Sequence, residues 1–272
     1  MIVKAIDSVL AQTYENWELI IINDASTDNT DEIVANYNDE RIVYLKNEKN
    51  LERSASRNKG IDIAKGDFIC FLDSDDFYLE NHLEEFEKCI IDNSNKEVVY
   101  YAETYVDNGD ILEKCTPNHV EINKLSYLER VLVSPIGVPR LCIAKTLFKN
   151  ETFNIDIKIG EDIDLLVRLI NMGVALIPNN KYTLAYLEHQ NRTYSKDNIE
   201  VLLLHINLIN NILKENKHSI SSNIYKKIKS NNYFYLARAY QNNRILRILY
   251  LIKSISYSPK NRLKEKIYMM IK

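Results

Sequence analysis

The chain has 272 residues, 46% of them hydrophobic and 27% charged, which is an ordinary composition for a globular protein with one sizeable core. No apolar run approaches the ~18 residues of a membrane span and no secretory signal opens the chain, so we expect a cytoplasmic protein, soluble or at most peripheral at the inner face of a membrane. The net charge of −3 conceals a division, because residues 201–272 carry 14 Lys and Arg against two acids, whereas residues 1–200 have a net charge of −15.

Strands and helices are predicted to alternate along the first 91 residues. Helical spacing of apolar residues and helix-capping residues predict helices at 2–12, 26–37, 55–66 and 79–91, and short apolar runs predict strands at 17–22, 41–45 and 67–72. Near-continuous apolar strands that alternate with helices are typical of parallel sheets covered on both faces. We therefore expect an α/β fold with a mostly parallel sheet flanked by helices.

The pattern changes after residue 96. The later predicted elements are a hairpin at 97–114, a helix at 160–173, strands at 174–178 and 181–189, and helices from 198 onward. Together with the division of charge, this pattern predicts an α/β domain over residues 1–197 and a basic helical extension over residues 198–272.

Acidic residues gather at the ends of three predicted elements. Asp24 follows the first strand, Asp73–Asp76 contains three acids after the third strand, and Glu161 and Asp162 begin the helix at 160–173. In open α/β sheets, ligands bind beyond the carboxyl ends of the strands, so we expect Asp24 and the Asp73–Asp76 group to meet at one crevice. The same residues could instead cap the following helices or match the helix macrodipole.

The segment "FLDSDD" (71–76) aims three carboxylates at one point after a buried strand. Like charges this close repel, so folding gains little from gathering them. Mg²⁺ and Mn²⁺ prefer carboxylate oxygens and typically use one or two protein carboxylates together with substrate phosphates. The sequence therefore predicts a Mn²⁺ or Mg²⁺ site that bridges the protein to a diphosphate and stabilises a leaving nucleoside diphosphate.

Four segments, "AIDSVLAQTYENWELIIINDASTDNT", "RNKG", "FLDSDD" and "GEDIDLLVRL", resemble in order and spacing the family-two inverting glycosyltransferases of the GT-A fold. The resemblance covers about residues 1–195, and although each segment alone is weak, the ordered set is highly specific. It implies transfer of a sugar from a nucleotide-sugar, expected to be UDP-linked, to a hydroxyl of a glycan or lipid-linked acceptor in surface polysaccharide synthesis.

The resemblance also implies how the donor is bound. Asp24 matches an acid that holds the nucleobase, and Arg57 matches a basic residue near the base. Asp73 and Asp75 match the D-x-D motif, the first near the ribose and the metal and the second on the metal. His189 resembles a histidine that approaches the metal or the diphosphate in some members. Judged without the resemblance, Arg57 could be a solvated helix residue and His189 a structural one.

Catalysis is implied for the "ED" pair. Asp162 matches the general base that removes the proton of the acceptor hydroxyl, with Glu161 as its neighbour in the motif. One displacement opposite the leaving group would invert the anomeric configuration without a covalent enzyme intermediate.

The beginning of the chain departs from the family. Family members open with a strand of the form V-S-V-I-I-P-x-Y-N before the helix that begins here at residue 2. Two explanations of this departure stay open. Either the start of this sequence is placed late or trimmed, or the protein is an inactive homologue that only binds nucleotide-sugars. A nucleotidyltransferase is a weaker alternative, because it should show an N-terminal Gly-rich phosphate loop.

The basic extension suggests a further partner. Residues 244–255, "RILRILYLIKSI", place apolar residues along one side of a basic helix, as in helices that lie on anionic membrane surfaces. Alternatively, these apolar stripes pack on the acidic body. We expect no nucleic-acid partner, because no recognisable nucleic-acid-binding module is present.

Overall fold

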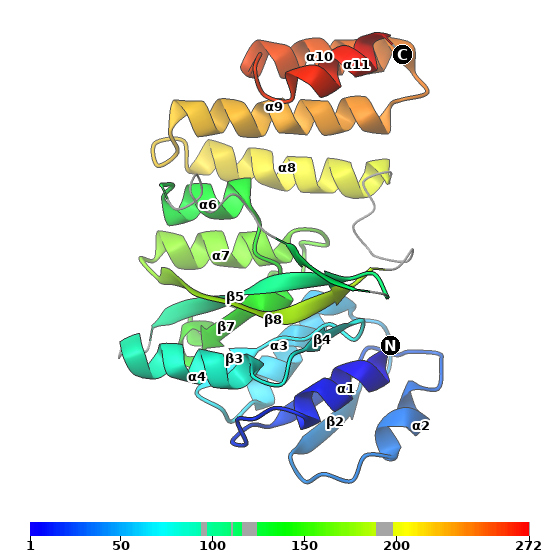
Figure 1. The fold of residues 1–272 in the computed structure, drawn as a ribbon, viewed down its shortest axis with the longest axis vertical. Coiled ribbons are helices and arrows are strands. Elements are labelled where there is room, and N and C mark those ends of the chain that lie inside the picture. The colour runs from blue at the N-terminus through cyan, green and yellow to red at the C-terminus, as the bar shows by residue number, and fades with distance from the viewer. Residues whose placement is uncertain (94–96, 110, 116–123, 189–197, 272) are drawn as a thin grey trace. The chain divides into compact units, whose positions relative to one another are not determined.

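The computed structural model describes residues 1–93, 97–109, 111–115, 124–188 and 198–271. The chain divides into two compact units (Figure 1): the first comprises Met1–Glu121 and Ile136–Gln190, and the second comprises Ile122–Pro135 and Asn191–Lys272. A short segment near residue 130 thus packs with the C-terminal helices, although it is distant from them in sequence.

The first unit begins with alternating helices and strands, as predicted. Its helices are α1 (Ile2–Leu10), α2 (Thr30–Ala35), α3 (Glu52–Ile63), α4 (His82–Asn93) and α7 (Glu161–Asn171), with short 3-10 helices η1 (Val138–Arg140) and η2 (Lys145–Lys149). Its strands are β1 (Leu19–Asn23), β2 (Ile42–Lys46), β3 (Phe68–Cys70), β4 (Asp76–Tyr78), β5 (Val98–Asp107), β6 (Leu112–Cys115), β7 (Leu141–Ala144) and β8 (Ala175–Leu187). The predicted hairpin is confirmed as β5 and β6. The two strands predicted at 174–178 and 181–189 are one continuous strand, because the irregularity between them is a shift in pairing with β5 and not a turn.

The strands form a two-stranded parallel sheet, β1–β2, and a six-stranded sheet of order β3-β7-β5-β8-β4, with β6 added to β5. The predicted α/β class is confirmed, but the expectation of mostly parallel pairing needs correction. Parallel pairing holds for β1 with β2 and for β5 with β8, whereas β3, β4, β6 and β7 are antiparallel to their described partners. An apolar run indicates that a strand is buried on both faces, but it does not indicate the direction of the strand. That direction is set by the connections between the strands.

The six-stranded sheet is covered on its two faces by α4 and α7 (Figure 1). Phe86 of α4 lies in a buried cluster with Val98, Tyr100, Ala102 and Cys142. The apolar stripe of α7 is buried at Ile163, Leu166 and Leu169. Both faces of the central strands are therefore apolar, which explains why these strands read as continuous hydrophobic runs in the sequence.

The second unit is helical over its described residues, as predicted for the chain beyond residue 198. Its helices are α6 (Tyr127–Val133), α8 (Ile199–Glu215), α9 (Ser222–Ala239), α10 (Arg244–Tyr257) and α11 (Leu263–Ile271). Ser126 and Glu129 form a capping box at the start of α6. The Glu129 carboxylate also accepts a hydrogen bond from the backbone N–H of Ser221 at 2.8 Å, which ties α6 to the start of α9. In the described part of the chain, no helix is both long and apolar enough to cross a membrane.

Candidate active site

Asp24 lies directly after β1, at the same sheet edge as Asn47, which directly follows β2. The parallel register, in which Asn23 pairs with Lys46, brings the two positions together. Asp24 Oδ1 accepts hydrogen bonds from Asn47 Nδ2 and from the backbone N–H of Leu51, each at 2.8 Å. Burial raises the pKa of Asp24, but these hydrogen bonds outweigh burial and bring the pKa below its ordinary value. The Asp24 carboxylate is thus ionised and held in one orientation.

Asp73, Asp75 and Asp76 form an acidic cluster in the short connection from β3 into β4. One carboxylate oxygen from each lies within 4.8 Å of the others. Asp76 is buried, and its Oδ1 accepts a hydrogen bond from the backbone N–H of Leu187 at 3.2 Å. Three oxygen ligands so close together fit a hard divalent cation such as Mg²⁺ or Mn²⁺, which would offset the repulsion among them.

Arg57 of α3 connects this acidic cluster to the beginning of α7. Its Nη1 donates to Glu161 Oε1 at 2.8 Å, and its Nη2 donates to Asp73 Oδ1 at 2.9 Å. Only 15% of the Arg57 side chain and 6% of the Glu161 side chain are exposed, so this ion pair is shielded from water. Burial lowers the pKa of Arg57, but the two carboxylates more than compensate and raise it. Arg53, one turn earlier, is 3.7 Å from the same Glu161 oxygen.

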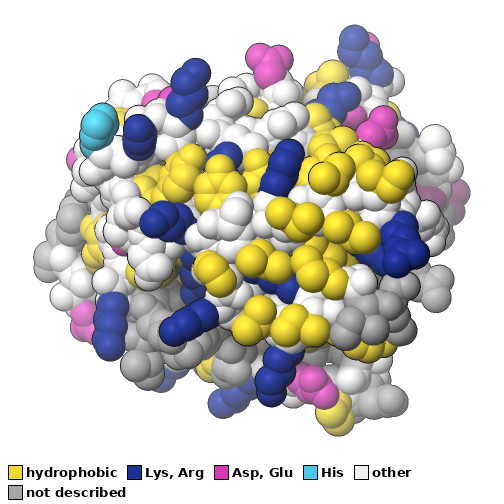
Figure 2. Space-filling view, turned by 90° about the horizontal axis from the view of Figure 1, so that it is seen from above, with side chains coloured by type: hydrophobic (Ala, Val, Ile, Leu, Met, Phe, Trp, Pro, Cys, Tyr) yellow, Lys and Arg dark blue, Asp and Glu magenta, His cyan; other side chains and the backbone are white. Residues whose placement is uncertain are grey.

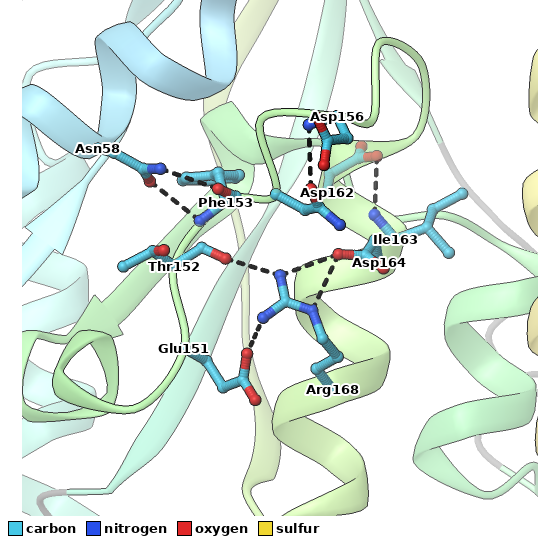
Figure 3. A network of polar contacts seen from close by, with 10 residues as sticks. Asn58, Glu151, Thr152, Phe153, Asp156, Asp162, Ile163, Asp164 and Arg168 are labelled. Carbon is cyan, nitrogen blue, oxygen red and sulfur yellow. Dashed lines mark hydrogen bonds and ion pairs between the residues drawn. The ribbon is translucent and has the colours of Figure 1, made fainter.

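Asp162 is the second residue of α7, which begins after Gly160 in a left-handed conformation (φ +84°) that favours glycine. Burial, and then repulsion from Glu161, raise the pKa of Asp162 to about 6. The backbone N–H of Ile163 donates to Asp162 Oδ1 at 2.8 Å and opposes this rise (Figure 3). A carboxyl group with this pKa is mostly ionised at neutral pH yet basic enough to accept a proton, as a general base must.

Asn58 and Arg168 hold the loop that precedes α7 (Figure 3). Asn58 Nδ2 donates to the Phe153 carbonyl at 2.8 Å, and the Phe153 N–H donates to Asn58 Oδ1 at 3.0 Å. Arg168 donates to the Thr152 carbonyl at 2.7 Å and forms an ion pair with Glu151. Because the loop is tied to both α3 and α7, the start of α7 has a defined position against α3.

Tyr186 of β8 is influenced by acids from the acidic cluster and from α7. Its Cα is paired with that of Asp76 in the sheet. Burial raises the pKa of Tyr186 far above its ordinary value, and Arg140 opposes the rise. The charges of Asp76, Asp73 and Asp162 raise this pKa further. Charges from the connection into β4 and from the start of α7 therefore both act on the Tyr186 hydroxyl group.

The predicted site residues that the structure describes all belong to the first unit: Asp24, Arg57, Asp73, Asp75, Glu161 and Asp162. Arg57, Asp73 and Glu161 are in direct contact, and Asp75 shares the acidic cluster with Asp73. Asp24 belongs to a separate hydrogen-bonded group that is joined to α3 through Asn47 and Ser56. The predicted metal ligand His189 lies outside the described residues. The chemical roles of all these residues stay predictions.

Three residues of the site had no role assigned from the sequence: Asp76, Asn47 and Asn58. Asp76 belongs to the quoted acidic segment, and its burial against β8 distinguishes it from its neighbours. Asn47 follows a parallel strand as Asp24 does, so the rule that ligands bind beyond strand ends could have found it. Asn58 carries no such signal, because its partner Phe153 is 95 residues away in sequence.

Similar proteins were found by sequence and by fold. WfgD of Escherichia coli, a UDP-Glc:alpha-D-GlcNAc-diphosphoundecaprenol beta-1,3-glucosyltransferase, is 36% identical over 146 residues, which cover 50% of this chain and 57% of WfgD. WfaP of Escherichia coli, which bears the same enzyme name, is 28% identical over 225 residues, or 80% of this chain and 84% of WfaP. The crystal structure of residues 1–349 of S. aureus TarS in complex with UDP matches with a TM-score of 0.58 and 18% identity, covering 94% of this chain and 84% of that one.

A mixed sheet flanked by helices, with acids gathered beyond its strands, defines a protein of the GT-A fold type, as in TarS. The model of glycosyl transferase family 2 matches residues 1–153, more than half of the chain, and the chain belongs to this family. The chain spans less than two thirds of the length of WfgD and of several other curated relatives.

Proposed function

We propose that this protein is a metal-dependent, inverting glycosyltransferase. It transfers a sugar from a UDP-linked donor to a hydroxyl of a glycan or lipid-linked acceptor during synthesis of a surface polysaccharide. The names of WfgD and WfaP, which specify a UDP-sugar and a lipid-linked acceptor, support this choice of substrates. The observation that carries the proposal is the Asp162 carboxyl group, with a pKa of about 6, joined through Glu161 and Arg57 to the acidic cluster.

In this proposal, the end of β1 binds the nucleotide. Asp24 accepts a hydrogen bond from the nucleobase, and its bonds from Asn47 and Leu51 orient it for that contact. Lys59 donates to the Asn47 side-chain oxygen at 2.8 Å, which fixes the orientation of the amide in turn. A carboxylate that is already immobilised loses little entropy when the donor binds, which favours affinity and selectivity.

Asp73, Asp75 and Asp76 would hold Mg²⁺ or Mn²⁺, since their clustered oxygens suit a hard cation. The bound cation would supply charge neutralisation for the departing diphosphate. Arg57 keeps Asp73 oriented, and the backbone N–H of Leu187 does the same for Asp76. His189, the other metal ligand implied by the family resemblance, is part of the same proposal.

Asp162 carries the proton in the chemical step. Its carboxylate takes the proton of the acceptor hydroxyl while the acceptor oxygen forms its bond to the anomeric carbon of the donor sugar. On the opposite side of that carbon, the bond to the diphosphate oxygen breaks, and the electron pair leaves with the nucleoside diphosphate. Glu161, bound by Arg57, keeps the first turn of α7 in place during this displacement.

The decisive experiment is a panel of nucleotide-sugars, with and without Mn²⁺, in which the released nucleoside diphosphate is measured together with donor binding. Metal-dependent release in the presence of an acceptor, strongest with a UDP-sugar, is the expected result. Binding of UDP-sugars without any release, over a range of glycan and lipid-linked acceptors, would instead support a binding protein without transferase activity. We also propose that the protein works as a peripheral protein at an anionic membrane surface.

A further inference from the structure

Helices α10 and α11 present an exposed surface that combines apolar and basic side chains (Figure 2). Its apolar members, between 44% and 73% exposed, are Ile245, Leu249, Ile252, Leu263, Ile267 and Tyr268. Figure 2, which looks onto these helices, shows hydrophobic side chains gathered in a broad patch with Lys and Arg in and around it. We call these six residues the α10–α11 face.

The apolar residues of this face are not needed for the packing of the helices. The inward side of α10 is a different stripe, in which Leu251 and Ser254 are fully buried. Leu251 packs in a cluster with Phe234 and Ala237 of α9. Because α10 has its own buried side, the outward Ile245, Leu249 and Ile252 add apolar surface in contact with water, which folding alone does not explain.

A buried lysine fixes the position of α11 beside α10. Lys266 is fully buried, and its Nζ donates to Ser230 Oγ at 3.0 Å, to the Ser258 carbonyl at 2.9 Å and to the Ser254 carbonyl at 3.4 Å. These three acceptors lie on α9, on α10 and just after α10. With its three protons satisfied by these neighbours, Lys266 holds α11 so that Leu263 and Ile267 face outward beside the stripe of α10.

The charges around the α10–α11 face are almost all positive. Residues 244–271 contain seven Lys and Arg and one acid, Glu265. Four of the bases are exposed: Arg244, Lys253, Lys260 and Lys264. A second copy of this chain docked through the same face would set these like charges against one another, which disfavours a symmetric dimer here. An anionic lipid surface offers both an apolar layer and opposite charge.

We propose that the α10–α11 face docks onto an anionic lipid surface, with Ile245, Leu249 and Ile252 entering the boundary between headgroups and acyl chains. The exposed Lys and Arg contact lipid phosphates, and Tyr268 lies at the interface, where its hydroxyl stays in water. This inference names the residues behind the peripheral membrane role proposed above. It is tested by binding alone, so its failure would leave the transferase proposal standing.

The test is sedimentation of the full chain with vesicles that contain phosphatidylglycerol and with vesicles of phosphatidylcholine alone. The chain should bind only the first and be released at high salt, because screening weakens the attraction between exposed charges. Replacing Lys253 and Lys264 with Gln should lower partitioning onto the anionic vesicles about 25-fold, at about fivefold for each charge. The matched control, Lys65→Gln with Lys149→Gln, removes two exposed charges from the first unit and should change partitioning less than about twofold.

A second pair of variants tests the apolar part of the face. Ile245→Gln with Ile252→Gln should lower partitioning at least about tenfold, whereas Ile91→Gln with Ile111→Gln, equally exposed isoleucines of the first unit, should not. UDP binding, measured in each variant, should stay at the parent value and so report an intact first unit. Equal binding of the parent to both vesicle types, or parent-like binding by the Ile245/Ile252 variant, would overturn the proposal. If the parent self-associates and the Ile245/Ile252 variant does not, the α10–α11 face binds a second copy of this chain instead.

Discussion

The sharpest prediction concerns Asp162→Asn, which should stabilise the fold and abolish transfer at the same time. The pKa of Asp162 is raised from 3.8 to about 6, first by burial and then by Glu161. A shift of about two pKa units corresponds to roughly 3 kcal/mol of free energy, at 1.36 kcal/mol per unit. Because Asp162 is only half-buried, screening by solvent should reduce the observed effect to about 1–2 kcal/mol.

The size of this stabilisation depends on pH. A carboxyl group whose pKa is higher in the folded state than in the unfolded state binds protons more tightly when folded, so ionisation destabilises the fold. For Asp162 this penalty is absent below about pH 4, grows between about pH 4 and 6, and is complete at higher pH. Asparagine cannot ionise and keeps the oxygen that accepts the Ile163 N–H bond, so the variant escapes the penalty.

The assay compares urea unfolding of the parent and of Asp162→Asn at about pH 4 and about pH 8, with Asp164→Asn as the control. Asp164 lies in the same first turn, but its carboxylate is paired with Arg168 at 2.9 Å, so its removal should not stabilise the fold. Asp162→Asn should gain free energy of unfolding only at the higher pH.

The turnover of Asp162→Asn should fall by about 10²–10⁴-fold with unchanged UDP affinity, because the general base acts on the acceptor. In the parent, kcat/KM should rise with pH through an apparent pKa of about 6. A stability gain that is the same at both pH values, or normal turnover, would refute the reasoning.

Three further predictions test the surroundings of this carboxyl group. Asp75→Asn should lower metal-dependent turnover at least about 100-fold. The metal-free variant should be as stable as the parent or more stable, because one of three mutually repelling charges is removed. Full activity of the parent in EDTA would contradict the metal assignment. Arg57→Met should lower the free energy of unfolding in urea by about 3 kcal/mol, because it removes the partner of Asp73 and leaves the buried Glu161 carboxylate with only the more distant Arg53. Arg53→Met, which removes a more exposed and more distant charge from the same helix, should cost under about 1 kcal/mol, and equal costs would refute the bridging role. Asn58→Ala should lower the free energy of unfolding by about 2 kcal/mol and also lower turnover, because it frees the loop before α7. The control Asn36→Ala, which removes an exposed hydrogen bond, should do neither. Unchanged turnover in Asn58→Ala would show that the loop is not needed for catalysis.

The order of local elements and the chemical character of the site could be predicted from the sequence. Apolar runs and helical spacing are local properties, and they located most helices and strands because burial of those residues drives their formation. The cluster of Asp73, Asp75 and Asp76 was visible because its members are adjacent in the chain. The paired acids Glu161 and Asp162 were recognised for the same reason. Local patterns also resembled a known family strongly enough for that family to be found from four short segments.

The relations between distant residues were decided only by the tertiary structure. Apolar strands do not specify their direction, so the antiparallel pairs of the larger sheet depended on how the connections run. The bridge from Arg57 to Asp73 and Glu161 spans 16 and 104 residues of sequence, and the bonds from Asn58 to Phe153 span 95. The pKa of Asp162 rises chiefly because the fold buries it, and burial is a property of the packed chain. The sequence therefore determined which chemical groups the site contains. The tertiary contacts of α3 with the start of α7, with the loop before it and with the strand ends determined the charge states and partners of these groups.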